Sequence, residues 1–184
     1  MIERKCGPCQ IDLFASRINT QCRQFFSWHP DPDAMAIDAF AQTWSYDGMY
    51  AFPPFSLIGR LLEEIERQQV DVKAILPLWP SQPWFPRALR LITRPPALLP
   101  KLKQTVYLPQ NPQEVHPLQT RMRLTLFCLS GKACKHVDYL RTLPLSSIVP
   151  GERTLSHNIE LISRSGFSFV TSGRLIKCTY LNAM

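Results

Sequence analysis

Hydrophobic positions in the first half of the chain predict alternating strands and helices. The clearest helix covers residues 56–69, where leucines and isoleucines recur every three or four positions and charged side chains fill the opposite face. Apolar runs at residues 49–52 and 72–79 predict buried strands before and after this helix, and a second helix is expected at residues 84–92. This succession predicts an α/β fold built from βαβ units with a parallel sheet.

Two shorter apolar runs, at residues 11–15 and 25–28, also fit buried strands. Asp12 lies inside the first run, where a carboxylate is costly unless it is hydrogen-bonded or bound to a ligand. It can either cap backbone amides of the next loop or contact a ligand, and the sequence leaves both alternatives open. Residues 34–40 fit a short helix as well as a third strand, and Asp38 lies there in similarly apolar company.

The second half of the chain predicts less regular structure. Six prolines between residues 95 and 117 indicate an irregular linker. Short helices are expected at residues 118–130 and 137–143, and a hairpin is expected from residues 167–170 and 175–180. We therefore predict three parts: an α/β domain at residues 1–94, a proline-rich linker at 95–118, and a basic, mostly disordered tail at 119–184.

The loop at residues 52–55, Phe-Pro-Pro-Phe, is the most distinctive local feature. Two adjacent prolines fix the backbone and remove two amide donors, so the loop is stiff. A loop between a strand and the following helix lies at the carboxyl edge of an α/β sheet, where ligands bind. Phe52 and Phe55 therefore either face a ligand or are buried beside a stiff connector.

Positive charge is concentrated in the second half of the chain. The formal net charge of +7 comes from residues 95–184, whereas basic and acidic residues balance in residues 1–94. A basic, proline-rich segment suits contact with the phosphates of DNA or RNA. A solvated linker has the same composition, so charge alone does not decide between these alternatives.

Other features of the composition point to an intracellular protein, nuclear or cytoplasmic, without membrane contact. The chain has no apolar run of about 18 residues and no apolar signal-peptide core after Met1. Its six cysteines are therefore expected to be reduced thiols. Cys6 and Cys9 have the spacing of half a zinc knuckle, but the second close pair is missing, and we predict no metal site.

Several short motifs occur in an order that resembles the polyprotein of DIRS-type retrotransposons, which encode a tyrosine recombinase. The matching segment there lies between ribonuclease H and the recombinase, so the other domains of such a polyprotein are implied partners. The resemblance covers nearly the whole chain. Its motifs are residues 11–19 (Ile-Asp-Leu-Phe-Ala-Ser-Arg-Ile-Asn), 26–32, 37–44, 50–55, 78–86 (Leu-Trp-Pro-Ser-Gln-Pro-Trp-Phe-Pro), 129–131, 143–144, 150–152 and 173–176.

The segment of the retrotransposon polyprotein that this chain matches is in turn similar, more distantly, to phage-type DNA N-6-adenine methyltransferases. That similarity implies a partial Rossmann-like fold, and the sequence leaves open whether residues upstream of residue 1 complete it. It also implies that Asp12, Ala15 and Asp38 line a site for S-adenosylmethionine. In that family a Pro-Pro loop holds an adenine that is flipped out of the base stack.

The implied catalytic loop consists of Phe52, Pro53, Pro54 and Phe55. Phe55 matches the aromatic residue that stacks on the base, and a carbonyl of Phe52 or Pro53 could accept a hydrogen bond from the exocyclic amine. Phe52, however, replaces the Asn or Asp that opens the family's loop. Such a preorganised polar group is worth roughly 10²–10³ in rate. Ala15-Ser16 also replaces a glycine-rich cofactor loop, so we expect weak or no methylation, and we favour a chain without a cofactor over one that binds S-adenosylmethionine.

Four functions remain open from the sequence. The favoured one is an inactive methyltransferase-like segment of a retrotransposon that binds nucleic acid. The others are an active S-adenosylmethionine-dependent DNA N-6-adenine methyltransferase, a non-catalytic accessory module whose basic tail contacts DNA or RNA, and a fragment of a decaying element without activity. No polymerase or recombinase active-site motif is present in the sequence.

Overall fold

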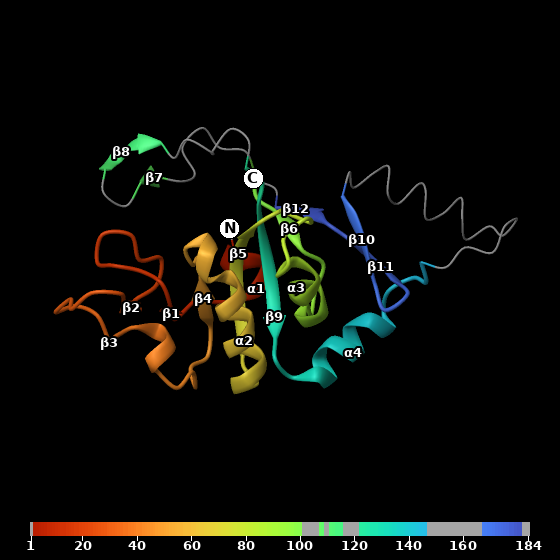
Figure 1. Cartoon of the computed structure of the whole chain (residues 1–184), viewed down its shortest axis with the longest axis horizontal. Coiled ribbons are helices and arrows are strands. Elements are labelled where there is room, and N and C mark those ends of the chain that lie inside the picture. The colour runs from red at the N-terminus through yellow and green to blue at the C-terminus, as the bar shows by residue number, and fades with distance from the viewer. Residues whose placement is uncertain (1, 101–106, 109–110, 116–121, 147–166, 182–184) are drawn as a thin grey trace, which may run out of the picture.

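The computed structural model describes residues 2–100, 107–108, 111–115, 122–146 and 167–181. Within these residues, eight strands form one mixed sheet in the order β12-β6-β9-β5-β4-β1-β2-β3 (Figure 1). The strands are β1 Ile11–Asp12, β2 Gln24–Ser27, β3 Ala36–Ile37, β4 Met49–Ala51, β5 Asp71–Pro77, β6 Ala97–Leu98, β9 Leu124–Ser130 and β12 Thr179–Tyr180.

Most of the strand pairs are parallel. β1 pairs in parallel with β2 and β4, β2 with β3, β4 with β5, and β12 with β6. β9 is antiparallel to both of its neighbours, β5 and β6. The protein is therefore of the α/β class, with a mixed and mostly parallel sheet that is compatible with a Rossmann-like fold.

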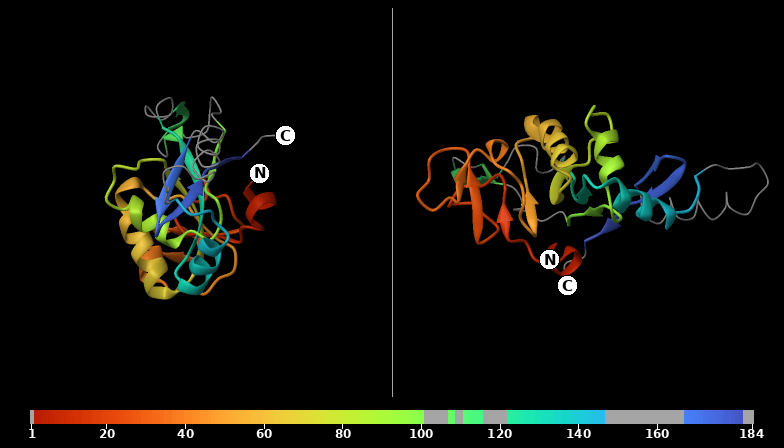
Figure 2. Two further views of the ribbon diagram at one scale, coloured as in Figure 1. Left: turned by 90° about the vertical axis from the view of Figure 1, so that its right-hand side faces the viewer. Right: turned by 90° about the horizontal axis from the view of Figure 1, so that it is seen from below.

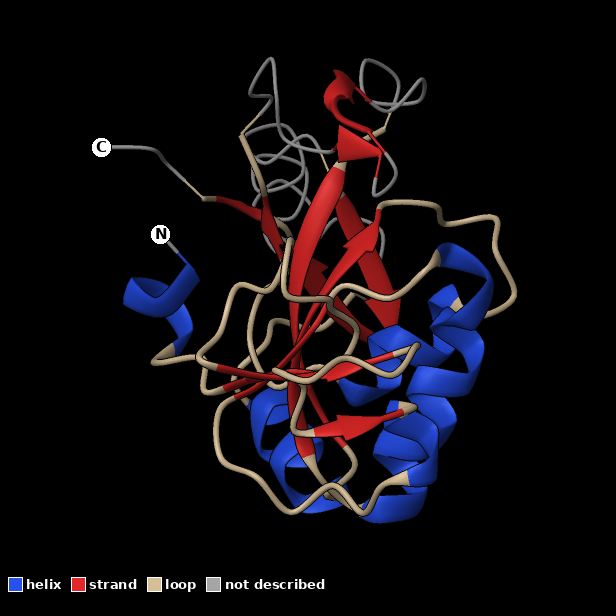
Figure 3. Cartoon of the chain, turned by 90° about the vertical axis from the view of Figure 1, so that its left-hand side faces the viewer, coloured by secondary structure: helices blue, strands red, loops and turns tan. Residues whose placement is uncertain are grey.

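Helices lie on both faces of the sheet. α2 (Ile58–Gln68) and α3 (Phe85–Leu91) cover one face, whereas α1 (Ile2–Cys6) lies on the other (Figure 2). Figure 3 shows the strands passing between α1 and the other helices. The apolar stripe of α2 is fully buried against the sheet, and its members are Ile58, Leu61, Leu62 and Ile65.

Several predicted elements are confirmed. β4, α2, β5 and α3 follow one another as expected: α2 buries its periodic apolar stripe, whereas β4 and most of β5 are buried along continuous apolar runs. The predicted hairpin is also present: β10 (Ser168–Thr171) pairs antiparallel with β11 (Arg174–Lys177) around Ser172 and Gly173, both with positive φ. For residues 34–40 the sequence allows either a strand or a short helix. The structure has the strand β3 there, and a 3-10 helix, η1 (Ala39–Ala41), begins near the end of this range.

The helix predicted at residues 118–130 is wrong, because residues 124–130 form β9. This strand lies inside the sheet, and both of its faces are buried, so its sequence is almost continuously apolar. β6, β9 and β12 all come from beyond residue 94, so the sheet extends past the domain boundary predicted there.

The remaining described segments of the second half are short. α4 (Ala133–Arg141) overlaps the helix predicted at 137–143, and the predicted linker contains a two-stranded pair of β7 (Tyr107–Leu108) and β8 (Asn111–Val115). Residues 95–100 of the linker are described and include β6, whereas linker residues 101–106, 109–110 and 116–118 and tail residues 119–121, 147–166 and 182–184 lie outside the described residues. In the described part of the chain, no helix is both long and apolar enough to cross a membrane.

Candidate functional site

The order in which the chain adds strands to the sheet reverses between β1 and β4. The chain runs from β1 outward through β2 to β3, and then returns to place β4 and β5 on the other side of β1. Asp12 of β1 pairs with Tyr50 of β4, so the loops that follow these two strands leave the sheet side by side. In open α/β sheets, ligands bind at the carboxyl ends of the strands at such a switch point.

The double-proline loop follows β4 at this edge. Pro53 is buried and Pro54 is exposed, and the Pro54 carbonyl accepts a hydrogen bond of 2.9 Å from the Leu57 amide, which starts a 3-10 turn, η2 (Phe55–Leu57). The Phe55 ring lies 5.0 Å from the Trp79 ring and 6.5 Å from the Phe52 ring, measured between centroids. All three rings are partly exposed, so the loop presents aromatic surface at the carboxyl edge.

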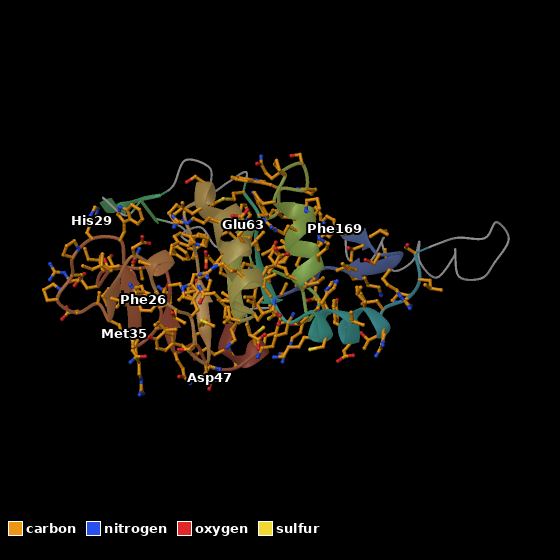
Figure 4. All side chains as sticks on the ribbon, turned by 60° about the horizontal axis from the view of Figure 1, so that its bottom comes forward. Phe26, His29, Met35, Asp47, Glu63 and Phe169 are labelled. Atoms are coloured by element: carbon orange, nitrogen blue, oxygen red, sulfur yellow. The ribbon has the colours of Figure 1, made fainter. Side chains whose placement is uncertain are left out.

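A cavity of about 410 Å³ lies between this loop and the start of α3. We call it the Phe55–Trp84 groove, and its lining residues are Phe55, Ser56, Gly59, Glu63, Gln82, Pro83, Trp84 and Arg87. Its volume falls within the range of small-molecule sites. At one side Arg87 of α3 donates hydrogen bonds to Glu63 (2.8 Å) and Glu66 (2.9 Å) of α2, and Figure 4 shows Glu63 between the two helices.

Asp12 is engaged within its own loop. One carboxylate oxygen accepts a hydrogen bond from the Phe14 amide (3.2 Å), and the other accepts one from the Gln21 amide (3.2 Å). The side chain is 3 % exposed, and burial raises its pKa to about 6, although the two amides oppose that shift. The carboxylate therefore shapes the loop between β1 and β2, which is the local-capping alternative.

Asp38 has a similar local role. It has a positive φ of 52° and caps η1, where its carboxylate accepts a hydrogen bond of 3.0 Å from the Phe40 amide. It follows β3, and β2 separates β3 from β1. The structure thus brings Asp12, Ala15 and the double-proline loop to one edge, while Asp38 lies two strands away from β1.

The residues after β1 do not fit S-adenosylmethionine as they stand. A cofactor at this edge needs free backbone donors, but the Ala15 amide donates to the Phe26 carbonyl (3.1 Å) and the Ser16 amide to the Asn19 side chain (2.7 Å). The Phe14 and Gln21 amides are taken by Asp12, as described above.

The raised pKa of Asp12 predicts a pH-dependent stability. The folded chain binds the Asp12 proton more tightly than the unfolded chain, whose pKa is near 3.8. The stabilisation of the fold by protonated Asp12 is fully present below about pH 4. It is lost as the pH rises through about 6, which lowers the free energy of unfolding by roughly 2–3 kcal/mol. Chemical denaturation of wild type and Asp12→Asn from pH 4 to 8 measures it. The wild-type curve should fall relative to that of the variant; parallel curves would contradict the role of Asp12.

Trp84 contributes one wall of the groove, although the motifs of the sequence give it no role at the site. The run of residues 78–86 carries the signal, since two tryptophans, a phenylalanine and three prolines surround Ser81 and Gln82. Trp84 also immediately precedes α3, whose second residue is Pro86, so the start of this helix sets the position of the ring.

Comparison with known proteins gives no match for this chain, either among protein-family models or among curated proteins. Across the described part of the chain, no three His, Cys, Asp or Glu side chains lie close enough together to hold a metal ion. The site is therefore interpreted from its own geometry.

Proposed function

We propose that this chain is a non-catalytic, methyltransferase-like domain of a retrotransposon polyprotein that binds nucleic acid. The observation that carries the proposal is the Phe55–Trp84 groove, which opens beside the double-proline loop at the carboxyl edge of the sheet. The origin in a retrotransposon rests on the motifs of the sequence.

The strand order supports a relationship to methyltransferases. β3-β2-β1-β4-β5 is the order of the Rossmann-like fold, and β9 and β6 extend it. An antiparallel strand inserted next to the last parallel strand is typical of methyltransferase sheets, and β9 has this position and direction. The double-proline loop then follows the strand that it follows in the phage-type enzymes.

The groove suits an unstacked base. Phe55 and Trp84 supply aromatic surface, and stacking of a base on an aromatic ring is worth about 1–3 kcal/mol. The Ser56 hydroxyl and the Gln82 amide line the same groove and can hydrogen-bond to a base edge. Arg123 is exposed where β9 begins, at the same edge, since its carbonyl accepts a hydrogen bond of 2.8 Å from the Leu78 amide. Its guanidinium lies over the Phe167 ring, with the central carbon 4.9 Å from the ring centroid, and the exposed N–H groups can contact a phosphate.

Two features argue against methyl transfer. Phe52 places a ring where the related enzymes place the polar side chain that hydrogen-bonds to the target amine. The amides of Phe14, Ser16 and Gln21 after β1 are also engaged within the loop, so they do not donate to a cofactor carboxylate. Binding of a base without a chemical step is the function that accommodates both features.

Replacement of Trp84 should weaken binding to single-stranded DNA. In fluorescence anisotropy with a labelled oligo-deoxyadenylate, Trp84→Ala should bind roughly 5- to 100-fold more weakly, because one stacking surface is lost. Trp84→Phe keeps an aromatic face and should retain most of the affinity. Trp28→Ala is the matched control, since Trp28 is 64 % exposed and lies outside the groove. Arg123→Gln should reduce the salt dependence by about one phosphate contact.

Two results would overturn the proposal. The first is an affinity that is the same in wild type, Trp84→Ala and Trp28→Ala, with each variant showing the wild-type unfolding curve. The second is saturable binding of S-adenosylmethionine in calorimetry, which would indicate the active adenine methyltransferase instead.

A further inference from the structure

Two cysteines that are far apart in the sequence meet at the amino edge of the sheet. Cys6 ends α1, and Cys128 lies in β9. Their sulfur atoms are 2.9 Å apart, which is within hydrogen-bond distance for two thiols. A disulfide needs about 2.05 Å between the sulfurs, so the bond requires a shift of about 1 Å.

Positively charged side chains hold Cys6 in place. Lys73 donates hydrogen bonds to the Gly7 carbonyl (2.9 Å) and the Pro8 carbonyl (2.5 Å), directly after Cys6. Arg94 donates one of 3.2 Å to the Lys5 carbonyl, directly before it. These bonds cap the carboxyl end of α1 and fix the thiol against β9.

A cavity of about 220 Å³ gives access to this thiol pair. Its lining includes Cys6, Cys128, Lys73, Arg94 and the ion pair of Lys135 with Asp71. It also includes Gly48 and Met49, where β4 begins, so it lies at the edge opposite the double-proline loop. A small anionic molecule can reach the sulfurs there, because three of these side chains are cationic.

The two thiols have different acidities. The hydrogen bond from Cys128 lowers the pKa of Cys6 to about 6, with help from Arg94, Lys73 and Lys5 against the effect of burial. The pKa of Cys128 is raised by the same hydrogen bond and by burial. Cys6 is therefore the more easily ionised thiol of the pair, and Cys128 is the one that holds its proton more tightly.

The second cysteine of the Cys6-x2-Cys9 motif also has a partner. The Cys9 thiol is hydrogen-bonded to the Cys22 thiol of the loop between β1 and β2, and this lowers the pKa of Cys9. The motif therefore does not act as a pair in itself. Cys6 faces Cys128 of β9, whereas Cys9 faces Cys22 of the loop between β1 and β2.

We propose that Cys6 and Cys128 form a redox-active pair that closes to a disulfide with a small anionic disulfide such as oxidised glutathione, and so cross-links α1 to β9. The Cys6 thiolate attacks one sulfur of glutathione disulfide and displaces one glutathione thiolate, which leaves a mixed disulfide on Cys6. Cys128 gives its proton to solvent and attacks the Cys6 sulfur, and the second glutathione leaves. The two cysteines lose two electrons, and one glutathione disulfide becomes two glutathione thiols.

Mass spectrometry tests this proposal on the full chain. A Cys9→Ser, Cys22→Ser double variant removes the neighbouring pair, and it is reduced, desalted and treated with oxidised glutathione at pH 7.5. We expect one internal disulfide, which joins tryptic peptides 6–17 and 124–132. With Cys128→Ser added, Cys6 should instead stay as a mixed disulfide with glutathione. With Cys134→Ser added the cross-link should be unchanged, because Cys134 is exposed on α4 and does not line the cavity.

The pH dependence of Cys6 modification is a second readout. The rate of alkylation of Cys6 by iodoacetamide should reach half its maximum near pH 6, below the value of about 8.5 for an ordinary cysteine. A stable mixed disulfide on Cys6 while Cys128 is present, or a Cys6 that stays reduced, would overturn the proposal. Zinc bound to the purified chain and lost on Cys6→Ser would also overturn it, because the thiols would then be metal ligands.

Discussion

A chain that ends at Arg94 is expected not to fold cooperatively. Such a chain lacks β9, which pairs with β5 over seven residue pairs, from Asp71 with Ser130 to Pro77 with Leu124. Phe127 of β9 is fully buried and packs edge-on against Phe85 of α3, with ring centroids 6.2 Å apart. Without β9, the apolar side chains of β5 face water. The free energy lost with this buried surface exceeds the net stability of an ordinary domain.

Circular dichroism and urea denaturation of the truncated chain measure this effect. We expect a non-cooperative curve for residues 1–94 and a sigmoidal curve for a chain that ends at Leu181. Phe127→Ala in the full chain is a milder change, and it should lower the free energy of unfolding by about 3–5 kcal/mol. A truncated chain with a cooperative transition near that of the full chain would contradict the central position of β9.

This result bears on how nucleic-acid binding is tested. Removal of residues 95–184 deletes the basic half, but it also deletes β6, β9 and β12 from the sheet. Loss of binding by that truncated chain would therefore reflect unfolding as much as loss of charge. Single substitutions such as Trp84→Ala and Arg123→Gln separate the two causes.

Gly131→Ala is expected to destabilise the chain by at least 1–3 kcal/mol, the usual cost of overpacking. Gly131 follows β9 and passes directly under the end of α2, where its amide donates a hydrogen bond of 2.9 Å to the Val70 carbonyl. An added Cβ would lie 1.9 Å from the Ile65 carbonyl oxygen and 2.9 Å from the Gln69 Cα. Both are backbone atoms, so β9 and α2 would have to move apart.

Gly59→Ala is the matched control for this prediction. Gly59 lies in α2 itself, and an added Cβ there would meet no atom within 4 Å. Alanine should raise the free energy of unfolding by about 0.5–1 kcal/mol, since glycine is a poor helix residue. Urea denaturation of both variants gives the comparison, and equal stability of Gly131→Ala and wild type would mean that the strand and helix are not in close contact.

The helix that the sequence predicts most clearly, α2, is buried on one face only. In α2 the apolar stripe alternates with charged residues, and its period identifies the helix. β9 has neighbours on both edges and both faces buried, so it shows no alternation, and periodicity cannot distinguish such a strand from a buried helix. Its place between β5 and β6 depends on pairing between distant residues, which no local pattern encodes.

The candidate site was predictable to a similar extent. The double prolines mark the end of β4 and therefore the carboxyl edge, because their effect on the backbone is local. The partners of Asp12 were not predictable, since its hydrogen bond to the Gln21 amide depends on the path of the loop between β1 and β2. That Trp84 and Phe55 line one groove depends in the same way on how α2 and α3 lie against one sheet.

The first helix and the last strand of the described chain lie in contact. Lys5 of α1 donates a hydrogen bond of 2.6 Å to the Thr179 hydroxyl of β12. Within a polyprotein, a segment with this geometry interrupts the path of the chain very little, because it receives and returns the backbone at nearly the same point. In the proposed polyprotein, domains joined to the two ends of this segment would therefore be close neighbours.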